Sequence, residues 1–280
     1  GVFDSDITIP AGIPDSVENI GSSAFQDCSF FTGSLTIPDS VTTIGDNAFS
    51  VCSGFTGSLT IPDSVTTIGF GAFSGCTGFT GSLTIPDSVT SIGSYAFNYC
   101  IGFTGSLTLS KSLTSIESDS FSYGYGFTGS LTIPDSVTTI GAFAFYQCNN
   151  FTGSLIIPEG VTTLEWNCFA FCTGFTGSLT IPDSVTTIEN GAFGGCSGLG
   201  PSLTIGRNVA SIGTSAFESC SNISNVNCYI EKSILDQSAI LLNTAVTTIH
   251  ARSTDSSWTA GAGQTIASKS NIEVIKDLPG

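Results

Sequence analysis

Eight of the ten cysteines in this 280-residue chain recur at one position of a 24-residue period. They are Cys28, Cys52, Cys76, Cys100, Cys148, Cys172, Cys196 and Cys220, with Gly124 in the one gap. Such a column suggests a disulfide ladder or a metal array. Stacked equivalent positions lie about 4.8 Å apart with parallel Cβ directions, which is a poor approach for a disulfide, and the single histidine, His250, cannot complete several tetrahedral metal sites. We therefore expect buried free thiols acting as small apolar residues, with Cys168 and Cys228 outside the column and unassigned.

An acidic column repeats with the same period. It comprises Asp15, Asp39, Asp63, Asp87, Asp135, Glu159 and Asp183. Carboxylates about 5 Å apart could bind Ca²⁺ if carbonyls or second carboxylates joined them. The unit lacks the Gly- and Asp-rich nonapeptide of calcium-binding β-rolls, so we interpret these residues as solvated turn positions. Lys111 and Arg207 replace the acid in two units and would relieve like-charge repulsion along the column. We expect no metal and no cofactor.

Catalytic motifs are lacking in the sequence. It has no G-x-S-x-G elbow, no H-E-x-x-H and no phosphate-binding G-x-x-x-x-G-K-S/T, and His250 has no repeated partner. A ladder of equivalent aspartates gives none of them the distinct environment that a glycosidase acid or base requires. We predict that the protein is not an enzyme.

The elements that position these columns follow from the period itself. The pattern F-T-G-S-L-T-I-P-D-S-V-T-T-I-G-x-x-A-F-x-x-C-x-G recurs without insertion from the unit ending at Cys28 to the unit ending at Cys220. A fixed period of this length predicts a solenoid whose units bury their apolar faces only by stacking. The Leu-x-Ile pair predicts a short strand with both side chains inward, ended by proline, and A-F-x-x-C is too brief for a full helix. In the second unit the six core columns are Phe31, Leu35, Ile37, Val41, Ile44 and Phe49.

Three segments result from this reading. Residues 1–12 form an N-terminal partial unit, 13–226 an array of about nine repeats, and 227–280 a degenerate repeat with a C-terminal cap. In the cap, residues 230–242 have near-helical apolar spacing, while 246–250 and 272–275 are predicted strands with Trp258 in a Gly-rich loop between them. The cap would cover the last apolar edge and block further strand pairing.

Charge and hydropathy exclude two classes of partner. Residues 1–226 hold 17 acidic groups against only Lys111 and Arg207, and the whole chain has a formal net charge of −16. An acidic body repels phosphate backbones and anionic head groups, so we expect neither nucleic acid nor membrane lipid as a partner. No run of 18 apolar residues occurs, so we expect no membrane insertion. The first residues lack a signal-peptide pattern and the chain has no Met, which suggests a mature or trimmed fragment.

The order of the columns resembles the BspA-like, Treponema-type leucine-rich repeats of bacterial surface proteins. Residues 59–68 read L-T-I-P-D-S-V-T-T-I and are followed by Ala72-Phe73 and Cys76, and the match covers about 13–226. The unit is one residue longer than is usual for that family. The resemblance implies a curved, right-handed solenoid with a parallel sheet of short strands on one face and little regular helix. It also implies an extracellular or cell-surface protein of adhesion or recognition. It supplies no ligand, so a protein, a glycan, a host-derived partner and self-association all stay open.

Departures from the period are concentrated in aromatic residues of the middle units. The candidate ligand-binding residues are Phe70, Tyr95, Tyr99, Tyr123, Tyr125, Phe143, Tyr146, Trp166 and Phe171. Rigid aromatic side chains with polar tips contribute large contact areas at low entropic cost, which suits a binding patch. The alternative is that several fold against the edge of the core or cap the irregular fifth unit, where Lys111, Ser120 and Gly124 break the pattern.

Columns of Ser and Thr suggest another function. Thr36, Thr60, Thr84, Thr108, Thr132, Thr180 and Thr204 occupy the outward position between Leu and Ile. Regular hydroxyl columns occur on ice-binding solenoids, but ice binding needs a flat face, whereas the sheet of a leucine-rich repeat is usually concave. Solubilising the strand face is the simpler interpretation. Ice binding and a purely structural stalk remain the alternatives to recognition.

Overall fold

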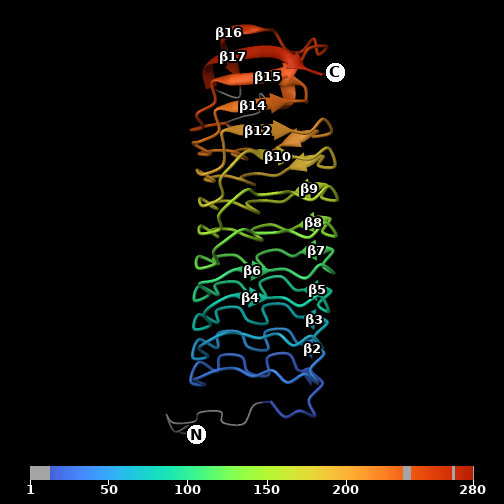
Figure 1. The fold of residues 1–280 in the computed structure, drawn as a ribbon, viewed down its shortest axis with the longest axis vertical. Coiled ribbons are helices and arrows are strands. Elements are labelled where there is room, and N and C mark those ends of the chain that lie inside the picture. Colours follow the sequence, from blue (N-terminus) through green and yellow to red (C-terminus); the bar gives the residue numbers. More distant parts are fainter. Residues whose placement is uncertain (1–12, 236–240, 267–268, 280) are drawn as a thin grey trace.

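The computed structural model describes residues 13–235, 241–266 and 269–279. The units stack as successive turns of one β-solenoid, with little bend in the view of Figure 1, and the C-terminal strands close one end. The parallel stack confirms the predicted solenoid class. The partial unit predicted at 1–12 lies outside the described residues.

Two parallel ladders run along the stack. The first pairs two-residue strands at Thr-Ile positions: β1 (Asn19–Ile20), β2 (Thr43–Ile44), β3 (Thr67–Ile68) and β5 (Ser91–Ile92) in one sheet, and β7 (Ser115–Ile116), β8 (Thr139–Ile140), β9 (Thr163–Leu164), β11 (Thr187–Ile188) and β13 (Ser211–Ile212) in another. The second pairs Leu-Thr positions: β4 (Leu83–Thr84) with β6 (Leu107–Thr108), and β10 (Leu179–Ile181) with β12 (Ser202–Ile205).

The Thr-Ile ladder was not predicted from the sequence, which placed one strand per unit at Leu-x-Ile. This second ladder forms because the chain turns at the proline that ends the Leu-x-Ile strand. The Val65 N–H donates to the Pro62 carbonyl (3.0 Å), and this turn redirects the chain into a second extended segment. There the Gly69 N–H donates to the carbonyl of Ile44 in the preceding unit (2.8 Å), and the same bond recurs through the array.

Two buried phenylalanine ladders fill the core. In the A-F-x-x-C column, Phe49 stacks on Phe73 with ring centroids 5.2 Å apart and planes 8° from parallel, and the stack continues to Phe217. In the other column, Phe55 stacks on Phe79 at 6.2 Å. Burial of each ring contributes about 1.5–3 kcal/mol, and stacking adds about 0.5–1.5 kcal/mol per pair. The core is therefore continuous from unit to unit.

The fifth unit keeps the stack despite its altered sequence. The Ser110 hydroxyl, in place of proline, donates to the Val89 carbonyl (2.6 Å). In the third unit the equivalent acceptor, the Val41 carbonyl, accepts from Ser64 (2.6 Å), whose counterpart Ser112 here donates to the Asp87 carbonyl (2.7 Å). At Gly124 a Cβ atom would meet the Phe127 ring at 2.7 Å. The Phe127 ring therefore occupies the space that a column cysteine fills elsewhere.

The array ends in longer strands. The six-stranded sheet has the order β10-β12-β14-β15-β17-β16 and includes β14 (Asn225–Cys228), β15 (Thr248–Arg252), β16 (Gly261–Ile266) and β17 (Lys269–Leu278). Strands β15 and β17 correspond to the predicted strands at 246–250 and 272–275. The loop predicted between them was partly wrong, because Gly261–Ile266 pairs antiparallel with β17. Of the helical pattern at 230–242, α1 (Lys232–Leu235) forms, and 236–240 lie outside the described residues.

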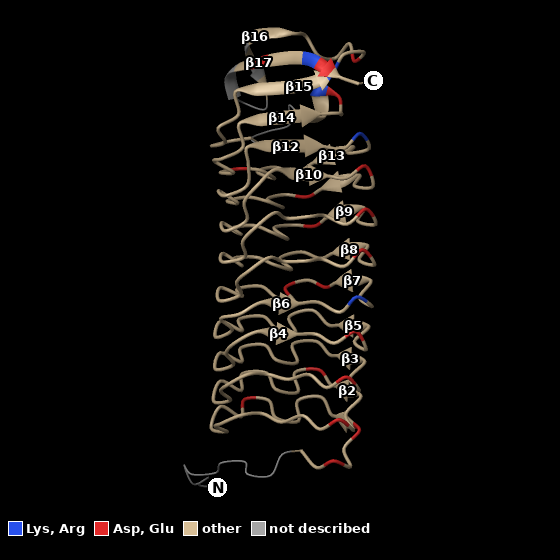
Figure 2. Cartoon of the chain, viewed as in Figure 1, with Lys and Arg blue, Asp and Glu red and all other residues tan. Residues whose placement is uncertain are grey.

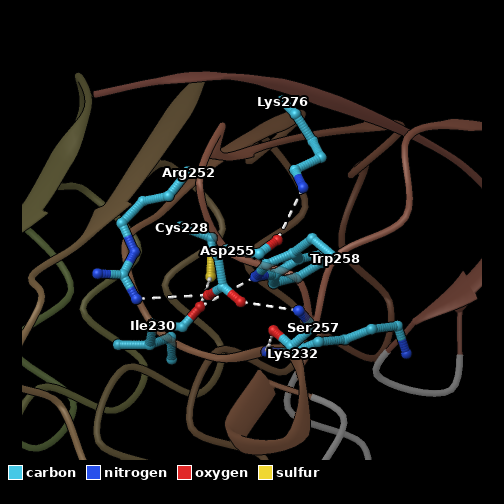
Figure 3. A network of polar contacts seen from close by, with 8 residues as sticks. All are labelled: Cys228, Ile230, Lys232, Arg252, Asp255, Ser257, Trp258 and Lys276. Atoms are coloured by element: carbon cyan, nitrogen blue, oxygen red, sulfur yellow. Dashed lines mark hydrogen bonds and ion pairs between the residues drawn. The ribbon is translucent and has the colours of Figure 1, made fainter. Parts of the chain in front are cut away.

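A buried tryptophan holds the C-terminal segment together. Trp258 is 2% exposed, and its indole Nε1–H donates to the Ile230 carbonyl (3.0 Å). Around it, the Asp255 carboxylate accepts from the Ser257 N–H (2.8 Å) and pairs with Arg252 at 3.4 Å, as Figure 3 shows. The antiparallel β16 interrupts the parallel ladder at this end, as expected for a cap.

Candidate recognition surface

The thiols of the cysteine column are free, as predicted, and all are buried except that of Cys28, which is half-buried. Each thiol from the second unit on also has a hydrogen-bonding role that the sequence did not reveal. The Cys100 Sγ–H donates to the Phe73 carbonyl (3.1 Å) and the Cys148 Sγ–H to the Phe121 carbonyl (3.2 Å). Burial raises the pKa of both thiols to about 12, so they stay protonated and donate. The cysteine column therefore links neighbouring units through thiol-to-carbonyl hydrogen bonds.

The acidic column lies on exposed turns, and Figure 2 shows Asp and Glu gathered along one edge of the stack. The basic replacements pair along it: Lys111 Nζ lies 3.9 Å from Asp87, and Arg207 Nε lies 2.9 Å from Asp183. These exposed pairs relieve repulsion locally and contribute little stability. Within the described ranges, no three His, Cys, Asp or Glu side chains are placed to hold a metal.

The outward Thr column between Leu and Ile is interrupted. In the seventh unit Ile156 takes its place and is 74% exposed. A second exposed Thr column directs its hydroxyls along the stack, where Thr66 Oγ1 donates to the Thr42 carbonyl (3.2 Å) and Thr138 Oγ1 to the Thr114 carbonyl (3.2 Å). These hydroxyl protons are therefore engaged within the protein.

The A-F-x-x-C segment forms two consecutive tight turns in each unit. In the fourth unit the Ala96 N–H donates to the Gly93 carbonyl (3.2 Å), and the Cys100 N–H to the Phe97 carbonyl (3.4 Å). The residue before Ala and the residue before Cys then both adopt a left-handed backbone, as Tyr95 (φ 62°) and Tyr99 (φ 55°) do. This geometry turns Ala, Phe and Cys inward and leaves the two left-handed residues on the surface.

Left-handed backbone favours Gly, Asn and Asp, because other side chains crowd the following carbonyl. The outer units mostly obey this rule: Asn47, Gly71, Gly75, Gly191 and Gly195 hold these positions. The middle units obey it only at Asp119 and Asn167. Five of the nine candidate aromatics occupy them: Tyr95, Tyr99, Tyr123, Phe143 and Phe171. Each such residue costs about 1–2 kcal/mol. Backbone strain of this kind is typical of functional positions.

The structure brings six of the candidate residues into one chain of ring contacts, which we call the aromatic band. Its members are Tyr99, Tyr123, Tyr125, Phe143, Tyr146 and Phe171. Tyr99 stacks on Tyr123 with centroids 4.1 Å apart, and Tyr146 meets Phe171 edge to face at 5.7 Å. The ends are exposed, Tyr99 at 46% and Phe171 at 47%, while the four members between them are half-buried. Packing against the core edge therefore accounts for part of the band only.

The other three candidates lie apart from these contacts. Phe70 and Tyr95 pair with centroids 5.4 Å apart. Trp166 is 54% exposed, and its Nε1–H donates to Glu189 Oε2 (2.8 Å). Each presents an exposed ring on the same A-F-x-x-C side of the units.

The phenols of the band form hydrogen bonds with one another and with Gln147. The pKa of Tyr123 is raised to about 12, mainly by a hydrogen bond with Tyr99 and secondly by burial. Tyr125 Oη donates to Gln147 Oε1 (2.7 Å), and Gln147 Nε2 donates to Tyr146 Oη (3.2 Å). The surface therefore offers aromatic faces bordered by uncharged polar groups.

Sequence reasoning missed two features of this surface. Val51 is a β-branched residue in a left-handed position (φ 60°) and is 47% exposed. In the eighth unit, Gly191, Gly194 and Gly195 leave a hollow beside Phe171. The run G-A-F-G-G at 191–195 was the available signal, since no other unit has three glycines around Ala-Phe.

Within the described residues, no helix has the length and apolar character needed to cross a bilayer. The 24-residue turns, the inward Leu and Ile columns and the parallel ladders define a leucine-rich-repeat solenoid. The family model described as BspA type leucine-rich repeat region (6 copies) matches residues 5–124, 55–176 and 123–247, and the chain belongs to this family.

Three solved structures are similar to this chain, and the two with TM-scores above 0.5 agree on its fold. A leucine-rich repeat protein from Bacteroides ovatus is 25% identical, with a TM-score of 0.56 over 96% of this chain and 72% of that one. The Treponema pallidum leucine-rich repeat protein is 23% identical, with a TM-score of 0.51 over 76% of this chain and 86% of that one. A leucine-rich cell surface protein from Faecalibacterium prausnitzii is 25% identical, with a TM-score of 0.41 over 95% and 91%. No curated protein matches the chain.

Proposed function

We propose that this protein is a non-catalytic recognition module of a cell surface, which binds a protein or glycan partner through the aromatic band. The observation that carries the proposal is the placement of Tyr99, Tyr123 and Phe171 in left-handed backbone. Gly75 and Gly195 hold the same position of the repeat at no steric cost. A binding role explains why large aromatic residues hold these left-handed positions in the middle units.

Membership of the BspA type family supports the surface location, because repeats of this type build surface and adhesion proteins. The acidic body supports a partner that is neither nucleic acid nor an anionic membrane. Exposed aromatic anchors beside hydrogen-bonding groups are the usual composition of an interaction hot spot.

The test is a variant that restores the relaxed residues of the outer units. Its five substitutions are Tyr95→Asn, Tyr99→Gly, Tyr123→Gly, Phe143→Asn and Phe171→Gly. Because each copies a residue type found at that position elsewhere in the array, the variant should fold. Binding would be measured against immobilised extracellular matrix proteins and a glycan array.

We expect the restored variant to lose at least tenfold in affinity for the partner that the native chain binds, which corresponds to about 1.4 kcal/mol. The control is Thr90→Ala with Thr138→Ala, which alters an exposed Thr column and should bind as the native chain does. Equal binding by the restored variant would show that the aromatic band has no part in recognition.

A further inference from the structure

The hollow of the eighth unit adjoins the exposed end of the aromatic band. It is lined by Phe171 and Asn167 from the seventh unit, by the three glycines of the eighth, and by Ser215, Glu218 and Ser219 of the ninth. Because strands stack about 4.8 Å apart, the seventh and ninth units form two walls about 9–10 Å apart. The missing side chains of one unit thus leave a slot one unit wide.

The slot has an aromatic wall and a backbone floor. A Cβ atom at Gly195 would meet the Phe171 ring at 2.5 Å. The ring therefore lies over this glycine, and it can do so only because residue 195 has no side chain. A Cβ atom at Gly191 would meet Asn167 Oδ1 at 2.2 Å, so the Asn167 amide also lies over the floor. Gly191 and Gly195 are therefore required by the side chains of the seventh unit.

The polar groups of the slot are available to a ligand. The polar side chains that line the slot are those of Asn167, Ser215, Glu218 and Ser219. They supply an amide, two hydroxyls and one carboxylate around a single exposed ring face. The hollow has a volume of about 340 Å³, which is at the lower end of the range for small-molecule sites. It is too small to hold a folded partner.

We propose that this slot is a saccharide subsite that takes one neutral or amino sugar ring, such as the end of a glycan. The C–H face of the sugar would stack on Phe171, and its hydroxyls would bond to Asn167, Glu218 and Ser215. The carboxylate of Glu218 and the net charge of −16 disfavour acidic sugars. This inference rests on the proposed recognition function and narrows its partner to a glycan.

The test uses matched substitutions at one repeat position. Gly195→Asn fills the slot and displaces the Phe171 ring, while Gly75→Asn makes the same change at the same left-handed position (φ +71° and +76°), where a Cβ atom meets Val51 at an ordinary 3.6 Å. Binding of N-acetylglucosamine, galactose, mannose and sialyllactose would be followed by ligand-observed NMR. Phe171→Gly and Glu218→Gln remove the ring and the charge.

We expect at least one neutral sugar to bind the native chain, and Gly195→Asn and Phe171→Gly each to weaken it about tenfold, the effect of losing one aromatic contact. Gly75→Asn should bind as the native chain does. Absence of neutral-sugar binding, preference for sialyllactose, or binding unchanged in both Gly195→Asn and Phe171→Gly would overturn the subsite.

The two proposals fail separately. If no sugar binds but Tyr99→Gly with Tyr123→Gly abolishes binding to a matrix protein, the subsite is wrong and the recognition surface stands. If sugar binding depends on the slot while Tyr99→Gly with Tyr123→Gly keeps full partner binding, the aromatic band is wrong and the subsite stands.

Discussion

The buried phenylalanine ladder and the surface aromatic band both place aromatic rings 24 residues apart in successive units, but one ladder is in the core and the other is on the surface. Phe97 and Phe121 lie fully buried with centroids 5.5 Å apart, and Tyr99 and Tyr123 follow two residues later in the same units with centroids 4.1 Å apart. The first pair has inward positions and relaxed backbone, and the second has left-handed backbone on the surface. A repeat therefore stabilises itself with one aromatic column, while the other column costs stability and offers a surface for binding.

Alkaline pH should unfold the protein because it ionises the buried thiols of the core. Burial raises the pKa of Cys100 and Cys148 from 9.0 to about 12 in the folded chain. A raised pKa favours folding below the unfolded value, so this stabilisation is complete below about pH 9 and is lost as the pH rises toward 12. Because several thiols act together, we expect cooperative unfolding in this window, followed by circular dichroism. Cys148→Ala should make the alkaline decline shallower, and an unchanged unfolding midpoint up to pH 12 would contradict the model.

Removing one core ring should have the largest effect of any single substitution. Phe121→Ala breaks two stacks, with Phe97 at 5.5 Å and Phe145 at 5.6 Å, at the centre of the array. We expect a loss of about 3–5 kcal/mol in the free energy of unfolding. Urea unfolding would measure it, with Phe171→Ala as the surface control. A comparable loss in the control would remove the distinction between the two columns.

Restoring the missing cysteine should destabilise the protein, although it makes the fifth unit more regular. A Cβ atom at residue 124 meets the buried Phe127 ring at 2.7 Å, so Gly124→Cys overpacks the core. We expect a loss of about 1–3 kcal/mol by urea unfolding. A gain in stability would contradict this expectation. It would mean that the Phe127 ring moves aside and that the restored cysteine contributes more stability than the altered packing costs.

Relieving the left-handed strain at one isolated position should stabilise the chain. Val51 has φ 60°, is 47% exposed, and lies outside the aromatic band, so Val51→Asn gives up little packing. We expect a gain of about 1 kcal/mol. Ile156→Asn is the control, because Ile156 is more exposed at 74% but is not among the left-handed residues. Equal changes in the two variants would exclude strain as the cause.

Much of the scaffold could be predicted because the repeat shows each core position eight or nine times. The columns of Leu35, Ile37 and Phe49 predicted inward faces that are buried in the structure, and the cysteine column predicted buried free thiols. The Thr-Ile ladder was missed because its strands are two residues long and depend on bonds to the neighbouring unit, not on alternation within the segment. Strand β16 was missed because its Gly-rich sequence pairs only through β17.

The candidate site was predictable as a set of residues but not as an arrangement. The sequence by itself determined the period, the core columns and the aromatic substitutions, because these depend on residue type and spacing. Only the tertiary structure decided that Tyr95 and Phe171 adopt left-handed backbone, that Tyr99 contacts Tyr123, and that Gly195 lies beneath a ring of the previous unit. These features arise between stacked units 24 residues apart, where the turn geometry of one unit sets what the side chains of the next can reach.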